Sequence, residues 1–70
     1  MNLTKMESEI LAALRDNVEA GTGDGWMNVY ILNAKPKNMT PHQFAGVLSN
    51  LQQKGLYRPR GDNYFGDVKI

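Results

Sequence analysis

The sequence predicts an α+β fold in which three helices are followed by a C-terminal two-stranded β-hairpin. Two segments predict helices, because their apolar residues recur every three to four positions. The chain ends in two short alternating segments joined by RGDN, which favours a hairpin. A length of 70 residues is typical of one domain, so residues 1–70 are expected to form a single unit.

The first helix is expected to begin after Thr4, whose hydroxyl can cap it, with Glu7 completing a capping box three residues later. Its apolar stripe consists of Leu3, Met6, Ile10, Leu11, Leu14 and Val18. The glycine-rich segment AGTGDG, residues 20–25, then ends the helix. No lysine follows this segment and no strand is expected before it, so it is predicted to be a plain loop and not a phosphate-binding loop.

The segment WMNVYILNAKP, residues 26–36, permits two interpretations. Its aromatic and β-branched residues permit a strand, whereas the spacing of its apolar residues equally permits two helical turns. We expect an extended start at Trp26 that passes into a short helix over residues 28–34. Pro36 disfavours a helix at Lys35, so the sequence KPKNM is predicted to be a basic turn.

The third helix is predicted over residues 40–54. Thr40 is a good cap, Pro41 suits the first helical position, and Gln43 completes a second capping box. Gly55 follows at the place where a left-handed helix end favours glycine.

The hairpin is predicted over residues 56–70, with Gly61 and Asn63 in its turn and Pro59 in a short or edge strand. Aromatic residues are expected in the core and not as groups that stack on bases; these are Trp26, Tyr30, Phe44 and Phe65. The predicted core is Leu3, Met6, Ile10, Leu14, Val29 or Tyr30, Ile31, Phe44, Val47, Leu48, Leu51, Leu56 and Phe65.

The composition argues against several classes of protein. The chain has no cysteine and one histidine, which makes a zinc centre or a disulfide framework a poor explanation, and no cofactor is expected. The sequence offers no nucleophile with a base and no paired carboxylates, so we do not expect an enzyme. No apolar run approaches the roughly 20 residues that span a bilayer, and the N-terminus is acidic where a signal peptide is apolar. A cytoplasmic protein without a membrane partner is expected.

The expected order of elements, with TPHQFAGVLSNLQQKGLYRPRGDNYF as its second half, resembles the winged helix-turn-helix domain, particularly the small MarR-like kind. The pattern L-x-x-K-G-L over residues 51–56 carries the resemblance. In that family the lysine and glycine close the recognition helix, and the leucine opens the first strand of the wing. The resemblance implies a DNA-binding protein that regulates transcription, of a phage or bacterial type.

The chain departs from that family in two respects. The segment MNVYILNA lacks the polar and alanine pattern of the usual middle helix. MarR-like regulators also carry terminal helices for dimerisation, which have no counterpart here. A homodimer and an effector pocket therefore stay open.

Charge is divided unevenly along the chain. Residues 1–34 hold two basic and five acidic side chains, and residues 35–70 hold six basic and two acidic ones. This asymmetry favours a polyanionic partner for the second half, although small numbers of charges often divide unevenly by chance.

Double-stranded DNA is the predicted partner. A helix fits the major groove, and the polar side of the 40–54 helix carries amides and hydroxyls that can reach base edges. Lys37, Arg58 and Arg60 are predicted to contact phosphates. The full set of predicted DNA-binding residues is Lys35, Lys37, Thr40, His42, Gln43, Gly46, Ser49, Asn50, Gln53, Arg58 and Arg60.

The alternative is a protein–protein interaction module that does not bind DNA. Tyr57, Tyr64 and Phe65 near the hairpin could then form an adhesive patch. A net charge of only +1 favours this alternative. A homodimer could form through the first helix or through the segment from Trp26 to Tyr30.

Overall fold

The computed structural model describes residues 3–21, 23–61 and 64–69 of the chain. Within these residues there are two α-helices, one 3-10 turn and four strands. In chain order the elements are α1 (Lys5–Asp16), β1 (Val18–Gly21), β2 (Trp26–Tyr30), η1 (Ile31–Ala34), α2 (Pro41–Gln53), β3 (Tyr57–Pro59) and β4 (Phe65–Lys69).

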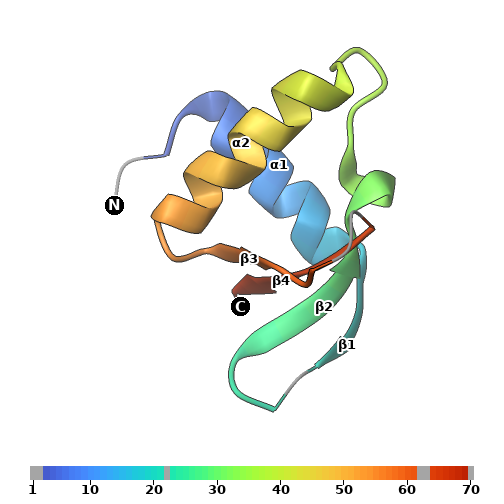
Figure 1. Ribbon diagram of the computed structural model, residues 1–70, viewed down its shortest axis with the longest axis vertical. Coiled ribbons are helices and arrows are strands. Elements are labelled where there is room, and N and C mark those ends of the chain that lie inside the picture. Colours follow the sequence, from blue (N-terminus) through green and yellow to red (C-terminus); the bar gives the residue numbers. More distant parts are fainter. Residues whose placement is uncertain (1–2, 22, 62–63, 70) are drawn as a thin grey trace.

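The four strands form one antiparallel sheet in the order β1-β2-β4-β3, and both helices lie on the same side of it (Figure 1). Strand β4 is central and pairs with β2 and with β3, so that Val29 lies opposite Gly66 and Tyr57 lies opposite Val68. Side chains alternate between the two faces of a strand. The register therefore decides which residues meet the helices and which lie on the other face.

The prediction of three helices and a two-stranded hairpin is wrong. The chain leaves the helical conformation at Asn17, and residues 18–21 pair with β2 instead of continuing the first helix. The apolar middle segment is a five-residue strand followed by a single 3-10 turn, because β-branched and aromatic side chains pack well in a sheet. The C-terminal hairpin is not separate, since β4 also pairs with β2.

The predicted starts of both helices and the predicted end of α2 are confirmed. Thr4 and Thr40 each accept a hydrogen bond from the backbone N–H three residues later, and both capping boxes are formed. Gly55, with φ of 77°, follows α2 in the left-handed conformation. Pro59 ends the edge strand β3, where its missing N–H breaks no ladder hydrogen bond in the middle of the sheet. The predicted turn residue Asn63 lies outside the described residues.

The core lies between the helices and the sheet. Its buried apolar residues are Ile10, Leu11, Leu14, Val29, Ile31, Ala34, Met39, Phe44, Val47, Leu48, Leu51, Tyr57 and Val68. Most of the predicted core is confirmed, and of the two alternatives Val29 and Tyr30, Val29 is the buried one. Met6 is 47% exposed, so its inclusion was wrong, and Leu3 and Leu56 are only partly buried.

One ion pair joins the two helices. The Lys54 ammonium donates a hydrogen bond to the carboxylate of Glu7, which is a buried residue of α1. The same carboxylate accepts the backbone N–H of Thr4. The hydrogen bond from Lys54 and that from Thr4 hold the pKa of Glu7 below its ordinary value. The lysine of the L-x-x-K-G-L pattern therefore fixes α2 against α1.

Among the described residues, no helix has the length and apolar character needed to cross a membrane.

Candidate functional site

Helix α2 exposes a polar side that carries no acidic residue. Its buried stripe of Phe44, Val47, Leu48 and Leu51 packs into the core. The predicted contact residues of this helix are all exposed, and we call them the α2 face: His42, Gln43, Gly46, Ser49, Asn50 and Gln53. Thr40 is also exposed, but its hydroxyl and backbone N–H are occupied in the cap. The structure thus brings most of the predicted base-reading residues together.

Two of the predicted contact residues already form hydrogen bonds within the protein. The side-chain oxygen of Gln43 accepts the backbone N–H of Thr40 at 3.0 Å, so a bidentate contact from Gln43 would require the cap to open. The ammonium of Lys35 donates to the carbonyl oxygen of Met39 at 2.8 Å and closes the turn before α2. Lys37 in the same turn is exposed. Of the two predicted lysines, Lys37 is therefore the one whose charge is directed to solvent.

Arg58 in β3 and Arg60 just after this strand do not join the α2 face. Tyr57 points into the core, so its neighbour Arg58 lies on the face of the sheet that is turned away from the helices. The Nε of Arg58 donates to one carboxylate oxygen of Asp67 at 2.8 Å, and the Nε of Arg60 donates to the other at 2.8 Å. Arg58 also lies 3.4 Å from Asp24. The prediction that these arginines flank the recognition helix has no support in this arrangement.

Asp67 is the organising group on that side of the sheet. The residue is only 2% exposed, although it points away from the hydrophobic core. Burial by itself raises the pKa of Asp67, but hydrogen bonds from Arg60, Arg58 and Asn28 outweigh this effect and hold the pKa below its ordinary value. The bond to Asp67 in turn raises the pKa of Arg58. The carboxylate therefore stays charged and fixes two guanidinium groups.

Aromatic rings lie on both sides of this charge cluster. The Arg58 guanidinium carbon lies 4.4 Å from the ring centroid of Trp26, and the Lys69 ammonium lies 5.2 Å from it. The ring of Tyr30 is 5.2 Å from Phe65 in an edge-to-face arrangement and 6.4 Å from the nearly parallel ring of Tyr64. The prediction that the aromatic residues belong to the core is correct for Phe44 alone; Trp26, Tyr30 and Phe65 are half-buried.

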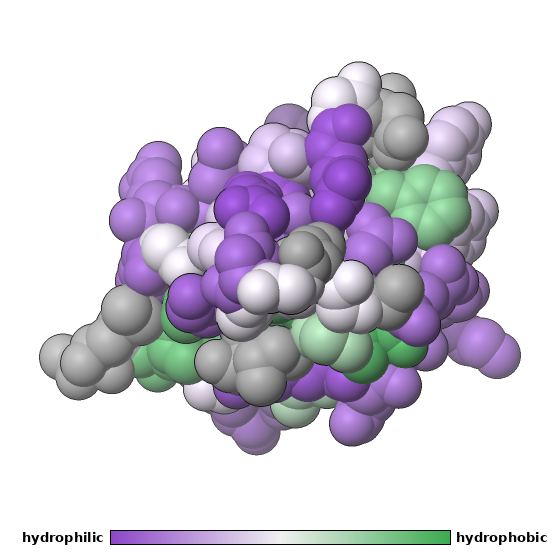
Figure 2. Space-filling model, turned by 90° about the horizontal axis from the view of Figure 1, so that it is seen from below, coloured by the Kyte–Doolittle hydropathy of each residue, from purple (hydrophilic) through white to green (hydrophobic). Residues whose placement is uncertain are grey.

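We call this surface the outer sheet face. It consists of Trp26, Asn28, Tyr30, Arg58, Phe65, Asp67 and Lys69, with Arg60 and Tyr64 next to it at the β3–β4 turn. Figure 2 shows the molecule from below, the side on which the sheet lies, and hydrophilic colours cover most of that view. Sequence reasoning missed this face, because its members come from three segments that only the strand register aligns.

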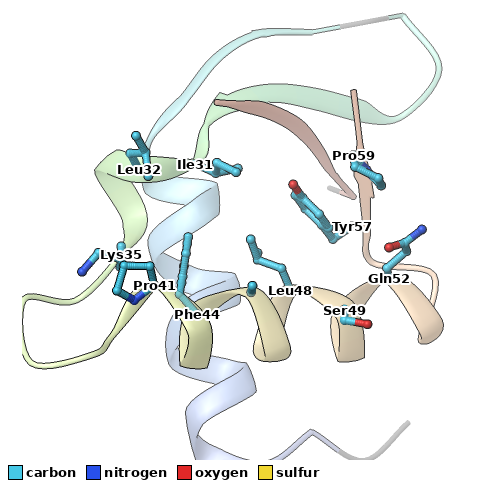
Figure 3. Close-up of a pocket in the computed structure, with 11 residues that line it drawn as sticks. Ile31, Leu32, Lys35, Pro41, Phe44, Leu48, Ser49, Gln52, Tyr57 and Pro59 are labelled. Atoms are coloured by element: carbon cyan, nitrogen blue, oxygen red, sulfur yellow. The ribbon is translucent and has the colours of Figure 1, made fainter. Parts of the chain in front are cut away.

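A groove of about 450 Å³ runs beside α2 (Figure 3). It is bounded by α2, η1 and β3, and Phe44 and Leu48 project from α2 toward Ile31 and Tyr57. Leu32 at its border is 44% exposed. Tyr57 is only 5% exposed, so the prediction that it belongs to an adhesive surface patch is wrong. An apolar groove with few polar groups is suited to holding an apolar side chain and not to catalysis.

The described residues contain no group of three or more metal-binding side chains. Within the same residues, every buried side-chain nitrogen or oxygen has a hydrogen-bond partner. The chain matches no protein-family model, no curated protein and no solved structure.

Proposed function

We propose that this protein binds double-stranded DNA, with α2 in the major groove, and that it acts as a small transcriptional regulator in the cytoplasm. The observation that carries the proposal is the α2 face: an exposed helix side with amide and hydroxyl groups and without a carboxylate. A helix of this kind fits the major groove, where an amide of Asn50 or Gln53 can pair with adenine. Gly46 in the middle of the face lets the backbone approach the bases closely.

Phosphate contacts are assigned to the lysine turn before α2. Lys37 is exposed close to the helix start, and the backbone N–H groups there add a favourable dipole for an anion. Arg58 and Arg60 supply less to this interface, because Asp67 holds both of them on the outer sheet face. Binding is therefore expected to be weak and to depend strongly on salt.

The test is fluorescence anisotropy with labelled random-sequence duplexes at low and at moderate salt. Lys37→Gln should weaken binding to all duplexes alike and reduce the salt slope by about one unit. Asn50→Ala should cost about 1–3 kcal/mol on a preferred sequence and little elsewhere. Gln52→Ala is the matched control, because Gln52 is an exposed amide on the same helix that lines the groove instead. No binding of any duplex at low salt would refute the proposal.

The second candidate function is protein binding without DNA, which is favoured by the groove beside α2 and by the exposed Leu32. A partner that inserts an apolar side chain there would cover both. A second copy of this chain is the simplest such partner, and light scattering over a range of concentrations tests it. A mass that stays monomeric up to high concentration removes the homodimer, and one that rises and is reversed by Leu32→Ser supports this surface.

A further inference from the structure

We infer that the outer sheet face binds single-stranded DNA by stacking unpaired bases on its aromatic rings. This surface is separate from the α2 face, since the helices cover the other side of the sheet (Figure 1). The rings and cations of the sheet face are the reason for inferring a nucleic acid. Only the choice of DNA over RNA rests on the proposed function.

Strand register places the rings on one face of the sheet. Trp26 and Tyr30 alternate with the core residue Val29 along β2, so both point away from the helices. Tyr30 lies directly opposite Phe65 on β4, and Tyr64 follows with its ring within 5° of parallel to that of Tyr30. Tyr64 is 54% exposed. Rings that lie half-exposed on a sheet offer π surfaces to bases without depending on base identity.

Cations accompany the rings. Lys69 and Arg58 both lie over Trp26, and Arg60 is held beside them by Asp67. The compensating carboxylate of Asp67 is buried, so a strand that crosses the face meets guanidinium groups and not the acid beneath them. Phosphates repeat along a strand next to every base, which is the pattern that alternating cations and rings complement.

An unpaired strand fits this surface better than a duplex does. The bases of a duplex are stacked inside the double helix. Among the described residues of β2 and β4, no segment projects from the sheet far enough to enter a groove and reach them. In a single strand the bases can turn outward and lie on aromatic side chains or on arginine planes. Asp24 is exposed and pairs with Arg58, and a phosphate of the bound strand would take the place of Asp24 in that contact.

The experiment uses the full chain and the fluorescence of its single tryptophan, Trp26. Oligothymidylate is titrated into the protein, in parallel with an abasic strand of equal length and charge, with a duplex and with oligouridylate. Oligothymidylate should quench Trp26 and bind roughly tenfold or more tightly than the abasic strand, because base stacking supplies the difference. Equal binding of the abasic strand would show that only charge attracts the strand and would overturn the proposal. Tighter binding of oligouridylate would overturn the assignment to DNA.

Variants separate this surface from α2. Tyr64→Ala removes an exposed ring, and Lys69→Gln removes a cation; each should weaken oligothymidylate binding several-fold, measured by anisotropy of a labelled strand. Asn50→Ala on the α2 face should leave it unchanged. Circular dichroism confirms that each variant folds. If the protein bound the single strand but no duplex, the proposed function would be refuted and this inference would stand. If Asn50→Ala weakened single-strand binding and Tyr64→Ala did not, this inference would be refuted.

Discussion

The α2 face and the outer sheet face both lie at the surface of the protein, but they are built in different ways. The α2 face comes from one stretch of chain, residues 42–53, and it carries no acidic side chain. The outer sheet face comes from three separate stretches, and Asp67 binds both of its arginines. A basic residue counted in the sequence can therefore be held by the fold on another surface than the one predicted for it. Lys37 is exposed beside α2, whereas Asp67 holds Arg58 and Arg60 on the outer sheet face.

The largest effect is expected from a substitution in the core, which supports both faces. Leu48→Ala truncates a buried residue of α2 and should cost about 2–5 kcal/mol. Small domains have total stabilities on the order of 5 kcal/mol, so the variant should be largely unfolded and should bind neither duplex nor single strand. Thermal melting followed by circular dichroism measures this. A melting curve identical to that of the parent would show that α2 is not held by this stripe.

Two glycines, one in each region, should respond to alanine with opposite signs. A Cβ on Gly66 in β4 would come within 2.4–2.7 Å of three atoms of the Tyr57 side chain, so Gly66→Ala should cost about 1–3 kcal/mol. A Cβ on Gly46 in α2 meets no atom within 4 Å, so Gly46→Ala should stabilise the protein by about 0.5–1 kcal/mol. Chemical denaturation of the pair measures both values. Equal effects would mean that Tyr57 does not lie against the strand.

Acid should weaken each region through its own buried carboxylate. The pKa of Asp67 and that of Glu7 are both lowered from ordinary values of 3.8 and 4.5. Each therefore contributes stability that is present above the ordinary pKa and is lost as the pH falls through the lower folded pKa. Asp67→Asn should cost about 1–2 kcal/mol at neutral pH, a modest value because both arginines are half-exposed.

The same variants divide the pH dependence between the two regions. Melting temperature is measured between neutral pH and pH 3 for the parent, for Asp67→Asn and for Glu7→Gln. Each substitution should flatten part of the acid limb, because the group that takes up a proton on unfolding is missing. A parent whose stability rises on acidification would contradict the direction of both pKa shifts.

The smallest expected effects on stability come from the exposed side chains themselves. Gln53→Ala and Tyr64→Ala should each change the free energy of unfolding by within about 0.5 kcal/mol, because neither side chain supports the core. These two variants therefore test binding without the complication of unfolding. A loss of more than about 2 kcal/mol in either would mean that its side chain packs against the fold.

The sequence was sufficient for the local features of this fold. Both helix starts were predicted, because Thr4 and Thr40 cap through residues only three positions away. The α2 stripe and the exposed α2 face were predicted for the same reason, since helical periodicity relates neighbours in the chain. The hairpin strands were also predicted, together with the position of Pro59 in an edge strand.

The predictions that were wrong concern features that depend on contacts between distant segments of the chain. The sequence pattern assigned residues 18–21 to the end of a helix, whereas pairing with β2 makes them a strand. Arg58 and Arg60 were expected to be free cations, because the predicted hairpin did not specify the register that places Asp67 opposite Arg58 and within reach of Arg60. Trp26, Tyr30 and Phe65 read as core, because hydrophobicity does not show on which face of a strand a ring lies. The arginines and the three aromatic residues all lie on the outer sheet face.

We propose that two separate faces of the protein bind two forms of DNA. Backbone amide chemical shifts, recorded by NMR with a random duplex and then with oligothymidylate, test it most directly. The duplex should shift the amides of residues 37–53. The single strand should shift the amides of β2, β3 and β4 and the side-chain N–H of Trp26. Shifts on one common set of residues for both ligands, or none on the outer sheet face with the single strand, would contradict it.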